Sequence, residues 1–441
     1  MSGSDYFARL AGVLAAAALL GLAIARPEAG RLAVERASDL APPRAALADR
    51  ACPAGQPALT HPFAPLEDVL SVSPLGAATA PGEPLPAPHI RVNTRRGETV
   101  FERRSVDVLA PARADIVAIE RRIERDETGR AAATSWTLRL KPCASVSVYY
   151  DRLDSVAESL IRRAGGLSAF VELGGPDHIA VETRIRVREG EFLGRADGFD
   201  VGLYDLAVPP APFARPERYR YDAFARAEVL DAPPSLLDAI RPDLARARCA
   251  LDYLPRDLRE AWTAKLGDAW GVRRAKGENA CRTALIDAPG AAQGVWFTDA
   301  SHNALTSRVS AIALAPDAID PERLVFALHG RLRSLKPEMV ALPPALEDRR
   351  AGATRDFLSF EKGAGLVNPP FDAVRENQIY CYQGLRANFV GPRINAVLLL
   401  QLSRAADGAR LMKLEARGDA LSCDALPAPW SFTGAETTFY R

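Results

Sequence analysis

Short segments of alternating apolar residues constrain this chain more than any other feature of its sequence. They recur from His61 to about residue 212, separated by Gly and Pro, and again from about residue 286 onward. The second set comprises GVWFT, RVSAIALA, RLVFALH, QIYCYQG, INAVLLLQL and RLMKLEAR, with a strong hairpin signal, Asp407-Gly408, between the last two. Period-two apolar segments bounded by turn residues predict strands. We therefore predict a mainly β fold with two β domains, 61–212 and 286–441.

A helical pattern separates the two sets of strands. Over residues 213–285, Pro255 stands at a plausible helix start, and Leu258, Trp262 and Leu266 recur at four-residue spacing. This spacing predicts a short helical insert that packs one apolar face against a core. A length of 441 residues agrees with about three such units.

The N-terminus is typical of an exported protein. Arg9 precedes the apolar run Leu10–Ala25, which is short for a membrane span of about 20 residues, and its last residues, AIA, suit a signal peptidase. We predict a signal peptide over residues 1–25, a linker over 26–60, and a periplasmic or extracellular location. The alternative is an uncleaved N-terminal anchor, which would then be the contact with a membrane.

Six cysteines agree with an oxidising compartment. An even count predicts disulfides, although six cysteines allow 15 connectivities. None of them lies in a C-x-x-C motif, which argues against a zinc ribbon or a redox motif. Their spacing favours structural bridges between neighbours: Cys52–Cys143, Cys249–Cys281 and Cys381–Cys423.

Four stretches of the first β domain share their order with the motifs of one enzyme family. PAPHIRVNTR contains His89 and Asn93, VLAPARADIVAIE contains an A-P-A turn, VSVYYDRLDSV contains Arg152, and VREGEFLGRADGFDVGLYDL ends in a strand with Val201 and Leu203. In this order the stretches resemble the lysostaphin/LytM-type zinc endopeptidases, which cut peptidoglycan cross-bridges. The resemblance covers residues 61–212 and implies a β sandwich of the barrel-sandwich-hybrid type.

Most of the chemistry that the resemblance implies is missing from this chain. His89 stands at a zinc-ligand position, Asn93 at the position of the aspartate ligand, Arg152 at that of a histidine, and Val201 and Leu203 at those of two more histidines. A catalytic zinc needs three protein ligands and an open position for water. One imidazole beside an arginine does not meet this need. The resemblance therefore implies a pseudoenzyme with no catalytic residue, no metal and no cofactor.

The same five residues form the predicted site. The resemblance implies that they converge in one groove, and old active-site grooves stay concave after their chemistry is lost. Arg152 would then hold an anionic or peptide ligand in that groove. The alternative is a surface ion pair of Arg152 with Asp151 or Asp154.

Another candidate site has a simpler explanation. DASHNALTS contains Asp299, Ser301 and His302, but neighbouring residues of a strand point to opposite faces and cannot form a triad among themselves. We expect a polar loop there, after a strand whose Trp296 packs in the core.

Together these features predict a non-catalytic exported protein that binds or scaffolds at the cell envelope, with cell-wall material or a wall hydrolase as its candidate partner. This role rests on the resemblance, since some degenerate LytM-like domains activate other enzymes. One alternative is an active zinc metallopeptidase with an atypical site. Another is an envelope adaptor with a lipoyl-like hammerhead module, although its tip, GEFLGRADG, lacks a lysine for a covalent cofactor. The net charge of +1 argues against a nucleic-acid partner.

Overall fold

The protein is described by a computed structural model, which covers residues 46–77, 87–95, 97, 104–126, 128–173, 175–216, 233, 235–236, 244–276, 280–281, 288–299, 311–329, 332–346, 349 and 357–441. The predicted signal peptide lies outside these residues. The chain from Leu47 to Arg441 forms one compact unit. The described residues are mainly β, with two α-helices, α3 (Glu158–Arg163) and α5 (Arg256–Thr263), which confirms the predicted fold class. Among them, no helix is long and apolar enough to span a membrane.

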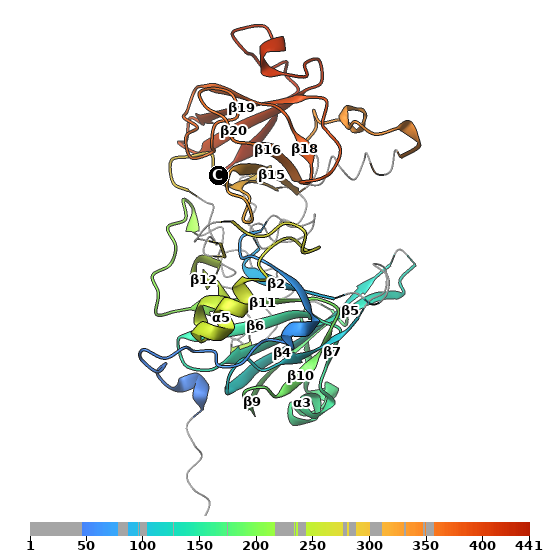
Figure 1. Ribbon diagram of the computed structural model, residues 1–441, viewed down its shortest axis with the longest axis vertical. Coiled ribbons are helices and arrows are strands. Elements are labelled where there is room, and N and C mark those ends of the chain that lie inside the picture. The colour runs from blue at the N-terminus through green and yellow to red at the C-terminus, as the bar shows by residue number, and fades with distance from the viewer. Residues whose placement is uncertain are drawn as a thin grey trace, which may run out of the picture. The chain divides into compact units, whose positions relative to one another are not determined.

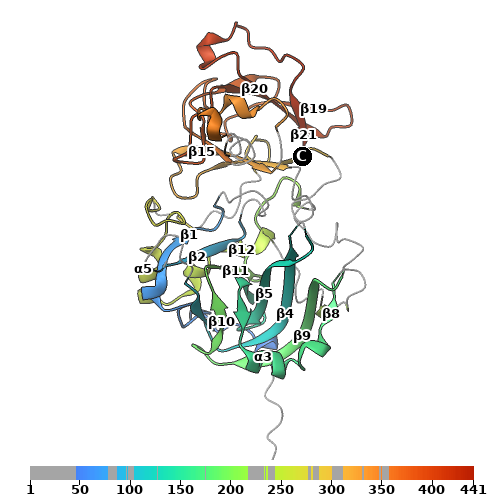
Figure 2. The same cartoon turned by 90° about the vertical axis from the view of Figure 1, so that its right-hand side faces the viewer.

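The first β domain contains a large antiparallel sheet and a small one (Figures 1 and 2). The large sheet has the order β1 (Val69–Ser73), β2 (His89–Thr94), β11 (Phe199–Asp205), β6 (Val146–Leu153), β5 (Ala131–Lys141), β4 (Ala114–Arg125), β9 (His178–Val187), β8 (Val171–Glu172), and β12 (Ala247–Arg248) also pairs with β11. The small sheet has the order β3 (Val106–Leu109), β10 (Phe192–Ala196), β7 (Ser155–Val156). This order makes β2, β11 and β6, which are far apart in the sequence, direct neighbours.

Two glycines shape the segment between β9 and β11, Gly190 in the turn before β10 and Gly194 within β10. Gly190 has a φ of 70°, in the left-handed region that favours glycine. At Gly194 a Cβ atom would lie 2.0 Å from the Ser155 carbonyl oxygen, so only glycine allows β10 to approach β7 this closely. Gly194 therefore permits the close pairing of β10 with β7 in the small sheet.

The insert contains a short packing helix, as its spacing predicts. Pro255 precedes α5, and the fully buried Trp262 packs edge-to-face on Phe63 with ring centroids 5.0 Å apart. The helix is shorter than the spacing suggests, because it ends at Thr263 while the buried Leu266 forms a bridge to Val72 of β1. Much of the rest of 213–285 lies outside the described residues.

Part of the predicted linker belongs to the first β domain. Leu59 is fully buried, and Cys52 forms a disulfide with Cys143. The composition of this segment lacks strand periodicity because it packs as irregular chain, held by the disulfide and by a hydrogen bond from Leu59 N to the Tyr253 carbonyl at 3.0 Å. The assignment of residues 47–60 to a linker is therefore wrong.

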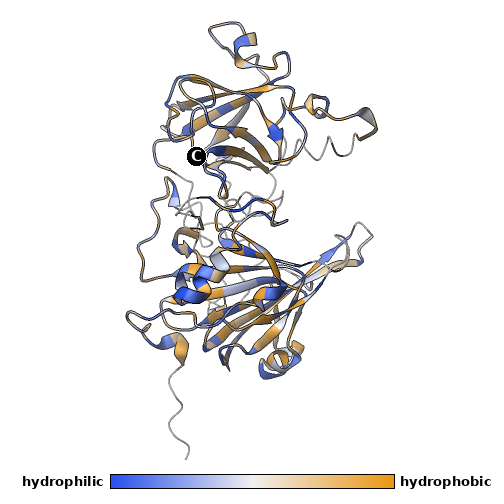
Figure 3. Cartoon of the chain, viewed as in Figure 1, coloured by the Kyte–Doolittle hydropathy of each residue, from blue (hydrophilic) through white to orange (hydrophobic). Residues whose placement is uncertain are grey.

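The second β domain is one antiparallel sheet. Its order is β17 (Ile379–Tyr382), β19 (Val397–Arg404), β20 (Arg410–Arg417), β21 (Thr437–Tyr440), β13 (Gly294–Phe297), β14 (Ala311–Pro316), β15 (Arg323–His329), β16 (Phe357–Glu361), β18 (Arg386–Ala387). Trp296 and Phe326 pack on one of its faces, while Val295, Phe297 and Val325 pack on the other. Burial on both faces explains the nearly continuous apolar runs in this part of the sequence, which are visible in Figure 3.

The three predicted disulfides are all present. They join Cys52 to Cys143, Cys249 to Cys281, and Cys381 to Cys423, which leaves no free cysteine. This number of disulfides indicates an oxidising, non-cytoplasmic environment.

Replacement of both Cys381 and Cys423 by alanine is expected to lower the free energy of unfolding by about 4 kcal/mol. The bridge closes a loop with a sequence separation of 42 residues, so its loss frees the unfolded chain. Urea unfolding of the wild type and the double variant measures the difference. An unchanged midpoint would show that the bridge does not stabilise this domain.

Candidate functional site

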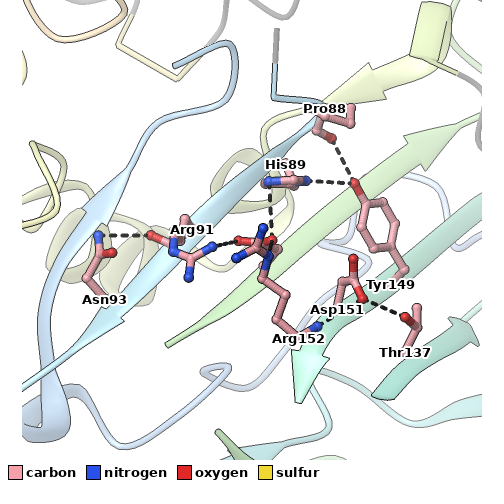
Figure 4. Close-up of polar contacts among 9 residues, drawn as sticks. Pro88, His89, Arg91, Asn93, Thr137, Tyr149, Asp151 and Arg152 are labelled. Carbon is pink, nitrogen blue, oxygen red and sulfur yellow. Dashed lines mark hydrogen bonds and ion pairs between the residues drawn. The ribbon is translucent and has the colours of Figure 1, made fainter. Parts of the chain in front are cut away.

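Three neighbouring strands bring part of the predicted site together. On β2, His89 pairs with Gly202 of β11, and Gly202 pairs in turn with Tyr149 of β6. Side chains alternate along a strand, so His89, Arg91 and Asn93 share one face of the sheet. We call this the polar face; Figure 4 shows its centre.

Val201 and Leu203 do not belong to the polar face. Both are fully buried in the apolar core, on the opposite side of β11. Their placement in the site by motif spacing is therefore wrong by one residue, and a shift of one residue moves a side chain to the other face of a sheet. The residues that β11 presents on the polar face are Asp200, Gly202 and Tyr204.

Asp200 is the centre of an ion-pair cluster that sequence reasoning missed. Its side chain is 1% exposed, and its carboxylate lies 3.4 Å from His89 Nε2, 3.2 Å from Arg91 Nη1 and 3.3 Å from Arg152 Nε. We call these four residues the Asp200 cluster. Alternation in HIRVNT and GFDVGLYDL was the signal that could have found Arg91 and Asp200.

The two oxygens of Asp200 differ in their contacts. Oδ1 accepts a hydrogen bond from Arg91, whereas the contacts of Oδ2 with His89 and Arg152 lack hydrogen-bond geometry. Oδ2 is buried and accepts no hydrogen bond from the described residues. Oδ2 is therefore held by ion-pair contacts rather than by a direct hydrogen bond.

A β-bulge directs Arg152 to this cluster. Leu138 pairs with Tyr150 and Trp136 with Leu153, so Asp151 and Arg152 together face the single residue Thr137. Arg152 has a φ of 64°, which is strained for an arginine. The Asp151 carboxylate holds the bulge, because it accepts hydrogen bonds from Thr137 Oγ1 at 2.6 Å and Arg152 N at 2.9 Å. Bulges of this kind re-aim side chains next to functional sites.

Tyr149 connects the Asp200 cluster to the rest of the polar face. Its hydroxyl lies 3.1 Å from His89 Nδ1, and its ring stacks on Tyr204 with centroids 5.5 Å apart. A Cβ atom at Gly202 would lie 1.9 Å from the Tyr149 ring, so the glycine makes room for it. Burial raises the pKa of Tyr149 well above its usual value, and the hydroxyl therefore stays protonated and cannot serve as a nucleophile.

A second buried carboxylate, Glu120, repeats the pattern on the same face. It is 2% exposed, and it lies 3.4 Å from Arg139 Nε, 3.7 Å from Arg122 Nη2 and 3.5 Å from His178 Nε2. We call these four residues the Glu120 cluster. Burial opposes ionisation of Glu120, but the hydrogen bond from His178 and the charges of Arg139 and Arg122 lower its pKa to about 2. Arg139 also stacks over the Tyr149 ring at 4.8 Å, which joins the two clusters.

Asn93 lies on the polar face but outside the Asp200 cluster. Its amide nitrogen donates to Ser71 Oγ and to Ser73 Oγ, each at 3.1 Å. These bonds tie β2 to β1 and leave Asn93 as a structural residue at the margin of the site.

The polar face does not have the composition of a metal site. Among the described residues, no group of three or more His, Cys, Asp or Glu side chains is placed to hold a metal ion. His89 is next to Asp200, but Arg91 and Arg152 occupy the space around that carboxylate. Of the other candidate motif, Ser301 and His302 lie outside the described residues.

Comparison of the chain with family models, with curated proteins and with solved structures finds no match. The function therefore has to be argued from the polar face itself.

Replacement of Glu120 by glutamine is expected to reduce the amount by which acid lowers the free energy of unfolding. A carboxylate with a lowered folded pKa stabilises the protein above its unfolded value of 4.5, and this contribution is lost as the pH falls toward about 2. The full effect is about 3 kcal/mol. Urea unfolding of the wild type and Glu120→Gln from pH 7 to pH 2.5 measures it. Parallel pH profiles would contradict the lowered pKa.

Proposed function

We propose that this protein is a non-catalytic, exported binding protein of the cell envelope, and that its polar face binds a carboxylate-bearing component of the cell wall. One observation carries the proposal: a single buried carboxylate, Asp200, positions two arginines whose side chains remain 30% exposed (Arg91) and 43% exposed (Arg152). The single charge of Asp200 is shared by two guanidinium groups, so neither is fully neutralised by it.

Guanidinium groups suit this ligand class. Arginine is always ionised and presents a planar fork of donors that matches a carboxylate in a two-point contact. Arg91 and Arg152 come from different strands and share one partner, which limits the orientations open to each. Less side-chain entropy is then lost when a ligand binds.

The backbone of Arg152 supports a binding role over a purely structural one. A left-handed conformation costs a non-glycine residue roughly 1–2 kcal/mol, and glycine would avoid that cost. Strain of this kind persists at sites where a particular side chain is needed. Arginine at a glycine-favouring bulge position therefore points to a use for its guanidinium group.

The location and the wall ligand also rest on the sequence. The three disulfides agree with an extracytoplasmic location. The N-terminal apolar run and the resemblance to lysostaphin/LytM-type enzymes favour export and a wall ligand. Two arginines beside His89 suit the recognition of an anion, which fits a binding protein.

Replacement of Arg152 by glycine tests this function. Glycine removes the backbone strain of about 1–2 kcal/mol, which offsets part of the cost of taking one cation from buried Asp200, and Arg91 remains as its partner. Urea unfolding of the variant verifies that it is folded before binding is compared. Its binding to purified peptidoglycan, measured by co-sedimentation, is expected to fall at least tenfold, since a charge-assisted contact contributes about 1.5–3 kcal/mol.

Two controls make the result specific. Arg195→Gln removes a 60% exposed arginine of β10 that is paired with Asp107, and it should bind as the wild type does. Peptidoglycan whose carboxylates have been converted to amides should bind only weakly to the wild type and to Arg195→Gln. If wild type and Arg152→Gly bind equally, or if amidation has no effect, the proposed function is wrong.

A further inference from the structure

The helical insert contains a loop with two exposed apolar side chains. After α5 the chain turns through GDAWGVRR, where Trp270 is 65% exposed and Val272 is 79% exposed. The Asp268 carboxylate accepts hydrogen bonds from the backbone N–H groups of Trp270, Val272 and Arg273 at 3.2, 2.9 and 3.2 Å. Such bonds from an aspartate to the following residues fix a turn. The indole is therefore held in solvent by an ordered loop.

A chain of hydrogen bonds joins this loop to the polar face. The Asn93 amide donates to Ser71 Oγ at 3.1 Å, and Ser71 Oγ donates to the Asp268 carbonyl at 2.6 Å. Gly267 N also donates to the Val72 carbonyl at 2.9 Å, which adds the insert to the edge of the sheet beside β1 (Figure 2). The polar face thus continues from the Asp200 cluster across β1 to the loop of Trp270.

Cationic side chains follow the same path. Arg95 continues the alternation of Arg91 and is exposed, Lys265 Nζ donates to the Val69 carbonyl at 2.9 Å, and Arg274 Nη1 donates to the Lys265 carbonyl at 3.4 Å. Burial, followed by the charges of Arg95 and Arg274, lowers the pKa of Lys265, which agrees with their proximity. We call the following residues the cationic strip: Arg152, Arg91, Arg95, Lys265 and Arg274.

The described carboxylates beside the cationic strip are fewer than its cations. Asp68 forms an ion pair with Arg104 at 3.0 Å, which leaves Asp151, Asp200 and Asp268 near the five cationic side chains. Among the described residues the strip therefore carries an excess of positive charge, which favours an anionic partner.

We propose that the cationic strip and Trp270 together bind one extended glycan whose sugar rings carry carboxylates. This inference rests on the proposed function at Arg91 and Arg152 and specifies the ligand. Four residues of extended chain separate Arg91 from Arg95, about 13 Å at 3.3 Å per residue, so one small carboxylate does not reach both. A polymer with repeated carboxylates does.

The exposed indole selects the kind of polymer. Its flat apolar face suits a sugar ring, which has an apolar face of its own, whereas an acidic peptide of aspartate and glutamate has no ring to place there. Trp270, Lys265 and Arg274 lie in the insert, outside residues 61–212. The preference for a glycan over an acidic peptide therefore comes from the insert rather than from the first β domain.

The test compares three probes with the full chain by titration calorimetry: oligomers of polygalacturonate, polyglutamate of equal charge, and neutral dextran. Polygalacturonate is expected to bind most tightly, and dextran not at all. Trp270→Ala should weaken the binding of polygalacturonate about three- to tenfold and leave that of polyglutamate unchanged. Arg95→Gln combined with Arg274→Gln should weaken the binding of both anions, most clearly at low salt.

Matched variants outside the strip serve as controls. Leu421→Ala removes a 71% exposed apolar side chain, and Arg256→Gln removes an 81% exposed arginine of α5; neither should change binding. Equal affinity for polyglutamate and polygalacturonate, with no effect of Trp270→Ala, would overturn the glycan inference. The proposed function survives that outcome if Arg152→Gly still loses peptidoglycan, so the two failures are distinguishable.

Discussion

The polar face depends on two carboxylates that the sheet buries and that its arginines neutralise. An unpaired charge in such a place costs several kcal/mol, so Asp200 and Glu120 are tolerated only with their partners in position. Those partners come from different strands, β2 and β6 for Asp200, and β5 and β9 together with β4 itself for Glu120. A slip of one residue would bury Asp200 among apolar side chains. The charge pairs therefore require one particular strand register. A change that breaks the pairs disturbs both the site and the fold.

Much of the fold could be predicted because its signals are local. Gly408 has a φ of 84° in the predicted Asp407-Gly408 turn between β19 and β20, and Trp296 is fully buried as strand aromatics normally are. The disulfides join the neighbours that spacing favours. Residues 47–60 give no such local signal, because a disulfide and single buried side chains such as Leu59 hold them in place without a strand pattern.

The site was harder to predict because its signals are not local. Motif spacing points to Val201 and Leu203, although the alternation of FDVGLYD places Asp200 on the more polar face. All seven residues of β11 are buried, so Asp200 needs cationic partners from other strands, which the sequence does not show. The sequence YYDRLD does not predict a bulge, since an arginine in the left-handed region contradicts local preference. The bulge exists because Thr137 and Asp151 bond across the strands. Local rules fail at this point, as they often do at functional sites.

The polar face attracts anions, whereas a metal site attracts a cation. Around a zinc ion, neutral imidazoles and carboxylates supply lone pairs to a cation. Here the one histidine next to Asp200 is accompanied by two arginines, which repel a cation and attract an anion at the same position. The buried carboxylate therefore supports the two arginines. Because Asp200 already restricts Arg91 and Arg152 in the unbound protein, a carboxylate ligand would meet donors that are largely ordered, and preorganisation of this kind converts a modest contact into useful affinity.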